Sequence, residues 1–171
     1  MVPLPNYITR AFAEPRPEKS DAACYYGPYN TLLHYLFPAS QGFEVVPFPQ
    51  PGHDRSLLFI VKKFKSPVLF FDVRAPLPPH TTDPTPFIEE AMRDMSHALR
   101  KILAKTKGIS MFGPMFVVYE YEYDAAANEL DAHVGSPALI EGGEGMRDIR
   151  TEEGMERMKE MARCIGGNAL E

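Results

Sequence analysis

The sequence contains no tryptophan and only two cysteines, Cys24 and Cys164, among its 171 residues. Two cysteines this far apart are typical of reduced thiols in an intracellular protein rather than of a disulfide framework. The sequence also lacks an apolar run of roughly eighteen or more residues, so no membrane span and no membrane partner are expected. Its first residues, MVPLPN, do not have the charged and then apolar layout of a signal peptide. We therefore expect an intracellular protein, cytoplasmic or nuclear.

Basic residues are in the minority, with 18 lysines and arginines against 23 acidic residues and a net charge of −5. Proteins that bind nucleic acid without sequence preference usually carry a basic surface, so the charge balance disfavours that class. It does not exclude an enzyme that approaches phosphate through a metal ion. The chain is long enough to bury the core of one domain.

The sequence divides into an arm and one domain. Residues 1–20 are rich in proline and charge and show no periodicity, so we expect a flexible N-terminal arm, which is either a tail or a segment that docks on a partner. Residues 21–171 are expected to form a single domain with its core at about 25–123. The expected elements are a helix over 22–37 that Asp21 can cap and Gly27-Pro28 interrupt, strands over 43–48, 57–63 and 67–74, a helix over 87–105 stopped by Gly108, a strand over 116–123, and a helix over 151–164.

This element order is α-β-β-β-α-β followed by a C-terminal helix. The strands over 57–63 and 67–74 are expected to form a hairpin, and the long helix after them is a crossover to the next strand. The sequence therefore predicts an α/β fold with a mixed β-sheet core and helices on both faces. The last helix carries methionines at helical spacing, which predicts a packed face.

The central pattern is the segment PVLFFDVR at residues 67–74. A run that is apolar on both faces is typical of a covered, central strand. Because strand side chains alternate, Asp72 and Arg74 are expected on one face, and Leu69, Phe71 and Val73 on the other. An acid and a base at the end of such a strand are costly unless each is paired, exposed or bound to an ion.

Asp54 is a second acid that the hairpin can bring to the same end of the sheet. It precedes the strand over 57–63, and antiparallel pairing places the start of that strand beside the end of the next. Two carboxylates there are ligands that suit Mg²⁺ or Mn²⁺, which would keep several waters and take further oxygens from phosphate. Such a metal can activate water for attack on a phosphodiester. The alternative is that Asp72 and Arg74 form a surface salt bridge and Asp54 caps a turn.

Asp54, then Asp72-Val73-Arg74 at the end of an apolar strand, within this element order, resembles the PD-(D/E)xK restriction-endonuclease-like superfamily. The segments YGPYNTLLHYLFP at 26–38 and YEY at 119–121 also resemble uncharacterised proteins, mostly from mushroom-type fungi, that carry the same pattern. The resemblance covers about residues 25–123. It implies a restriction-endonuclease-like fold and a metal-dependent nuclease-like function.

The resemblance assigns catalytic roles to Asp54, Asp72 and Arg74, with Asp54, Asp72 and the carbonyl of Val73 around the metal. Arg74 stands where the family has lysine. Because arginine effectively cannot lose its proton, it could hold a phosphate or orient water but not act as a base. Loss of hydrolytic activity is therefore an open alternative.

Tyr29 and Asn30 on the first helix and His97 on the long helix are the candidates for substrate contacts. For each, a structural role is the competing interpretation, because aromatic stripes usually belong to a core and most helical histidines are not ligands. No P-loop, nucleotide-binding glycine motif or Ser-His-Asp spacing is present, so no organic cofactor is expected.

Two functions follow from these observations. The first is a Mg²⁺- or Mn²⁺-dependent enzyme that cleaves phosphodiesters, with nucleic acid as the substrate despite the unfavourable charge. The second is a non-catalytic binding or assembly module on the same fold, whose arm, methionine-rich helix or aromatic cluster contacts a protein partner or a second copy of the chain. Both acids of the motif favour the first, and the arginine and the acidic surface favour the second.

Overall fold

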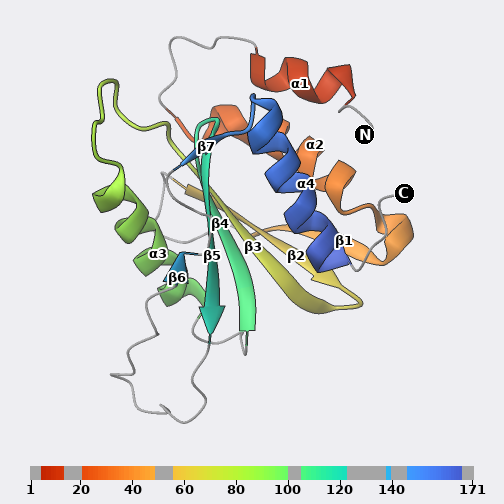
Figure 1. Cartoon of the computed structure of the whole chain (residues 1–171). Helices are drawn as coiled ribbons and strands as arrows, with labels where there is room; N and C mark the ends of the chain where they lie inside the picture. The colour runs from red at the N-terminus through yellow and green to blue at the C-terminus, as the bar shows by residue number, and fades with distance from the viewer. Residues whose placement is uncertain are drawn as a thin grey trace, which may run out of the picture.

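The computed structural model describes residues 5–13, 21–48, 56–99, 105–122, 138–139 and 146–166 (Figure 1). The helices are α1 (Asn6–Ala13), α2 (Ala23–Leu36), the short 3-10 helix η1 (Ala39–Gln41), α3 (Thr85–Leu99) and α4 (Glu152–Gly166). The strands are β1 (Phe43–Phe48), β2 (Ser56–Lys63), β3 (Ser66–Arg74), β4 (Lys105–Phe112), β5 (Met115–Glu122), β6 (Ala138–Leu139) and β7 (Arg147–Asp148).

All the strands belong to one mixed sheet with the order β1-β2-β3-β4-β5-β6, and β7 also pairs with β5. β3 lies inside this sheet, antiparallel to β2 and parallel to β4. Its neighbours in register at Asp72 are Leu58 and Ser110. The predicted hairpin is confirmed, and its turn consists of Phe64 and Lys65 alone, because Lys63 pairs with Ser66.

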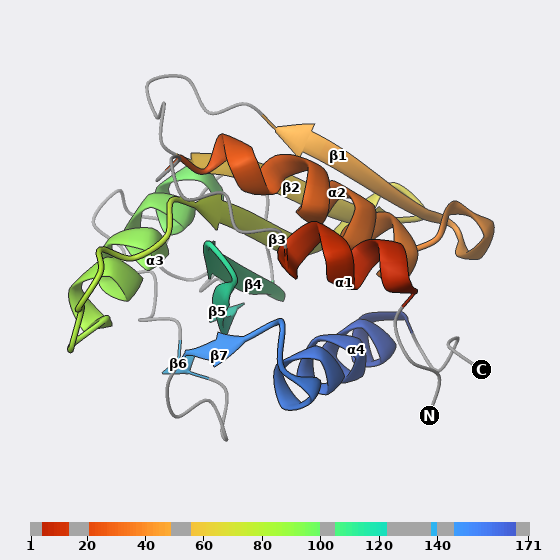
Figure 2. The ribbon, with the colours of Figure 1, turned by 90° about the horizontal axis from the view of Figure 1, so that it is seen from above.

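Helices cover both faces of the sheet, as the sequence predicts. Figure 2 shows α1, α2 and α4 on one face and α3 on the other. The larger core lies under the three helices, where Leu69, Phe71 and Val73 of β3 are fully buried. A smaller core lies under α3 and includes Phe70 of β3 and Met95 of α3. The alternation along β3 therefore turns Asp72 and Arg74 toward α3.

Helix α2 runs without interruption through Gly27 and Pro28, so the predicted break there is wrong. A proline inside a helix removes one backbone hydrogen bond. Burial of one face of the helix outweighs this loss, since Tyr29, Leu32 and Leu33 are completely buried. The predicted role of Asp21 is confirmed, because its Oδ1 accepts a hydrogen bond from the Ala23 backbone N–H at 3.1 Å.

An additional strand begins at the residue where the crossover helix was predicted to end. α3 is described over Thr85–Leu99, and Lys105 already belongs to β4 (Lys105–Phe112). Gly108 therefore lies within a strand, opposite Phe70 of β3, and does not stop a helix. The error arose because β4 begins with polar residues and only Ile109 and Met111 supply the alternating pattern.

Helix α1 lies in the N-terminal segment for which no regular element was expected. Its residues Ile8 and Phe12 are buried, with exposed fractions of 0% and 8%, and they belong to the larger core. The sequence pattern is short, so the period was not recognised. At the other end of the chain, α4 confirms the predicted last helix, and Met155, Met158 and Met161 are buried on its inner face.

Candidate functional site

The candidate site is an ion-pair cluster between the end of β3 and helix α3. Arg74 Nε donates to Asp72 Oδ2 at 2.5 Å, as the period of the strand predicts. On the other side, Arg74 Nη2 donates to Asp94 Oδ2 of α3 at 2.8 Å. One guanidinium group therefore contacts two carboxylates from two elements, and it links the sheet to the helix that covers it.

This cluster is much less exposed than a surface salt bridge. The side chain of Asp72 is 2% exposed, that of Arg74 is 14% exposed and that of Asp94 is 24% exposed. Burial opposes the charge of Arg74, but the charge of Asp72 and the hydrogen bonds to both acids together raise the pKa of Arg74 above its usual value. Arg74 therefore stays protonated, and it has no chemistry as a base at this position.

Asp94 was not among the residues selected from the sequence. A signal for it exists, because Asp94 lies three residues after Ala91 and one before Met95, both of which are buried in the smaller core. An acid on the apolar stripe of an amphipathic helix is expected to have a buried partner. Identifying Arg74 as that partner requires knowing where α3 crosses the sheet, which the sequence does not specify.

The described residues contain no group of three or more histidine, cysteine, aspartate or glutamate side chains that is placed to hold an ion. Arg74 contacts Oδ2 of Asp72 and Oδ2 of Asp94, so a cation at these two oxygens would have to displace the guanidinium group. Asp54, the other expected ligand, lies outside the described residues.

Tyr29 and Asn30 are predicted site residues that do not lie at this cluster. Val73 lies between Asp72 and Arg74 in β3, with its side chain in the larger core, so its expected role as a ligand through the backbone carbonyl stays a prediction. Tyr29 and Asn30 belong to α2, which covers the opposite face of the sheet. His97 lies three residues after Asp94 in α3, and its side chain lies outside the described part of the chain.

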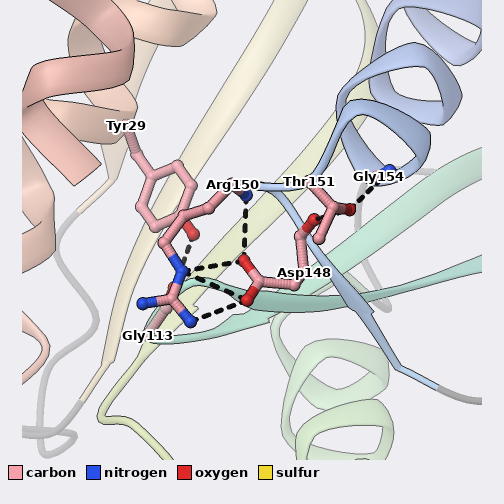
Figure 3. Close-up of polar contacts among 6 residues, drawn as sticks. All are labelled: Tyr29, Gly113, Asp148, Arg150, Thr151 and Gly154. Atoms are coloured by element: carbon pink, nitrogen blue, oxygen red, sulfur yellow. Dashed lines mark hydrogen bonds and ion pairs between the residues drawn. The ribbon is translucent and has the colours of Figure 1, made fainter. Parts of the chain in front are cut away.

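Tyr29 has a structural position at the far side of the sheet (Figure 3). It is fully buried, its ring lies 5.3 Å from that of Phe71, and its hydroxyl group donates to the carbonyl oxygen of Gly113 at 2.5 Å. Burial, with a smaller contribution from Tyr25 and Asp148, raises the pKa of Tyr29 well above its usual value. Tyr29 therefore fixes α2 to the turn between β4 and β5.

A second set of contacts in Figure 3 fixes the start of α4. Asp148 pairs with Arg150 through both carboxylate oxygens, at distances of 2.6–3.1 Å. Thr151 Oγ1 donates to the Asp148 carbonyl oxygen and accepts from the Gly154 N–H, so it caps the helix. The pairing with Arg150 lowers the pKa of Asp148. Asp148, Arg150 and Thr151 therefore have a structural role at the start of α4.

Comparison with known proteins adds no family: no family model, curated protein or solved structure matches the chain. Across the described residues, every helix is too short or too polar to traverse a lipid bilayer.

Proposed function

We propose that this chain is a non-catalytic binding or assembly module on a nuclease-like α/β fold. The observation that supports this proposal is the placement of Arg74 between Asp72 and Asp94. In an active metal-dependent hydrolase, Asp72 would offer its carboxylate to an ion and the basic residue would face the substrate. Here Arg74 makes ion pairs with two acids of its own chain, which is the arrangement of a structural clamp.

The charges of the cluster agree with this role. Two carboxylates and one guanidinium leave a local charge of about −1, which does not attract a phosphodiester, and Asp72 is almost inaccessible. A partly buried ion pair of this geometry fixes two elements in one arrangement. The module would then act through its surface rather than through this cluster.

Thermal unfolding with and without metal tests the proposal. With EDTA as the reference, added Mg²⁺ or Mn²⁺ is expected to leave the melting temperature unchanged. A metal bound only to the folded state would stabilise it by roughly 1.4 kcal/mol at ten times its Kd. For a chain of this size, such a gain would raise the melting temperature by about 3–6 °C.

The variant Asp72→Asn distinguishes the two functions by the sign of its effect. If Asp72 is the partner of Arg74, the variant lowers the free energy of unfolding by about 3 kcal/mol, as expected when one member of a buried pair is removed. If Asp72 instead faces a second acid at an empty metal site, the variant raises stability by relieving repulsion. Stabilisation, together with a metal-induced shift and cleavage of DNA or RNA, would establish the metal-dependent phosphodiester hydrolase in its place.

A further inference from the structure

The turn between β2 and β3 has a backbone conformation that does not suit its residues. Phe64 and Lys65 both have positive φ, of 48° and 72°. Two consecutive residues of this kind form a type I′ turn, for which Asn-Gly is the pair with least strain. A bulky side chain in this region is an outlier, and outliers of this kind concentrate at functional sites.

The ring of Phe64 lies flat on the backbone of Gly42. A Cβ added at Gly42 would be 2.5 Å from Phe64 Cε1 and 3.0 Å from both of its ring neighbours, Cδ1 and Cζ. Such similar distances mean that the ring turns its face toward Gly42, because in an edge-on ring Cδ1 and Cζ would be farther from the added Cβ. Phe64 is nevertheless 76% exposed, more than any other exposed large hydrophobic residue among those described. The opposite face of the ring is therefore open to solvent.

Three lysines, Lys62, Lys63 and Lys65, are neighbours of Phe64 along the hairpin. Lys65 is exposed, and Lys62, whose side chain is 31% exposed, is only loosely paired with Glu44 at 3.8 Å. Lys63 donates to the carbonyl oxygen of Gly166 at 2.6 Å, and its charge adds to the local field. The tip is thus a basic surface with an aromatic platform on a chain whose net charge is −5.

We propose that this hairpin tip binds a nucleotide group, with an unpaired base stacked on the open face of Phe64 and its phosphate at Lys65 and Lys62. Base–aromatic stacking and lysine–phosphate contacts are the two interactions by which single strands are held without sequence readout. A bilayer is a poorer fit, because the ring lies along the backbone rather than projecting from it. The tip lies at the opposite end of β2 and β3 from Arg74, so this proposal is independent of the proposed function.

The first test measures the binding of a fluorescein-labelled oligothymidylate at low salt by fluorescence anisotropy. The second measures the binding of a mononucleotide from the NMR shifts of the backbone amides at the hairpin tip. The double variant Phe64→Asn/Lys65→Gly is expected to weaken oligonucleotide binding by at least about tenfold, as loss of one stacked base implies. The same variant is expected to raise the melting temperature, because it supplies the preferred turn residues. Its loss of binding therefore cannot be attributed to unfolding.

Single variants separate the stacking from the charge. Phe64→Leu, which keeps the lysines, is expected to lose about tenfold in affinity, whereas Phe64→Tyr and the exposed control Phe48→Ala bind as the wild type does. Binding is expected to weaken with salt, with a logarithmic slope of about −0.7 for each phosphate contacted. If the mononucleotide shifts the tip amides, the free nucleotide is a ligand. If the oligonucleotide binds and the mononucleotide causes no shift, the ligand is a single strand.

Three results would overturn the proposal. The first is the absence of binding of either probe at low salt. The second is equal affinity in the wild type and Phe64→Leu. The third is a Phe64-dependent interaction with vesicles of phosphatidylcholine and phosphatidylserine but with neither nucleotide probe.

Discussion

At the scale of single residues, the structure assigns the same kind of contact to two arginines in different surroundings. Arg74 is largely enclosed and bridges two acids, whereas the side chain of Arg150 is 52% exposed and, among the described residues, has Asp148 as its ion-pair partner. An exposed ion pair contributes little to stability, and a largely buried pair is sensitive to the loss of one partner. The two arginines are therefore a matched pair for measuring what the cluster contributes.

Arg74→Lys is expected to lower the free energy of unfolding by about 2 kcal/mol, because an ammonium group cannot reproduce the two-sided fork that reaches both Asp72 and Asp94. Arg150→Lys is expected to cost no more than about 0.5 kcal/mol. Urea denaturation of the two variants measures both values. Equal effects would mean that the cluster at Arg74 is not the clamp that we describe.

Gly154 is a residue at which the surrounding backbone leaves no room for a side chain. A Cβ at Gly154 would be 2.1 Å from the carbonyl oxygen of Asp148, which is backbone and cannot move aside as a side chain can. Gly154→Ala is therefore expected to destabilise the protein by about 2 kcal/mol or more, in the range of overpacking. Gly27 in α2 is the control, since nothing lies within 4 Å of its added Cβ and Gly27→Ala is expected to stabilise by about 0.5–1 kcal/mol. Thermal or urea unfolding of the two variants gives the comparison, and destabilisation by both would contradict it.

At the scale of the elements, α2 is held to the sheet by a polar contact as well as by its apolar face. The hydroxyl group of Tyr29 reaches Gly113, between β4 and β5, from the middle of the larger core. The sequence offered Tyr29 as a candidate for substrate contact, with a position in the core as the competing interpretation. The structure places it in the core, because Phe12 and Phe71 lie against its ring.

Tyr29→Phe is expected to lower the free energy of unfolding by about 1–2 kcal/mol at neutral pH, since it leaves the Gly113 carbonyl without this donor. The pKa of Tyr29 is raised above the usual value of 10.0 in the folded state, so the folded state prefers the neutral phenol. The resulting stability is fully present below pH 10 and is lost as the pH rises through the folded-state pKa. Unfolding followed by circular dichroism should therefore show a steeper loss above about pH 10 in the wild type than in Tyr29→Phe. Parallel pH profiles would show that Tyr29 ionises as freely in the folded state as in the unfolded state.

At the scale of the whole molecule, the sequence was most informative where an element has one strong period. The bounds of β1 and the hairpin, and the side-by-side placement of Asp72 and Arg74, follow from alternation along single strands. β4 and α1 were missed because their patterns are short and polar at one end. The contact with Asp94 depends on how α3 lies across the sheet, and that is set by packing between elements remote in the chain.

Hydrogen exchange should distinguish the centre of this sheet from its edge. β3 is paired on both sides and buried on both faces along Leu69–Val73, so these amides are expected to exchange only through global unfolding. Within the described part of the sheet, β1 pairs only with β2. Because Phe64 N–H donates to the Gly42 carbonyl oxygen at 3.1 Å, alternation directs the amides of Glu44, Val46 and Phe48 toward β2.

The amides of Phe43 and Val45 then point away from β2, and Pro47, which has no N–H group, occupies the next outward position. A proline there costs the sheet no hydrogen bond and blunts the open edge. Exchange measured by NMR should accordingly alternate along β1, slow at Glu44 and Val46 and fast at Phe43 and Val45. Equal protection of Val45 and Val46 would mean that another strand covers this edge in solution, and a dependence of that protection on protein concentration would identify the strand as part of a second copy of the chain.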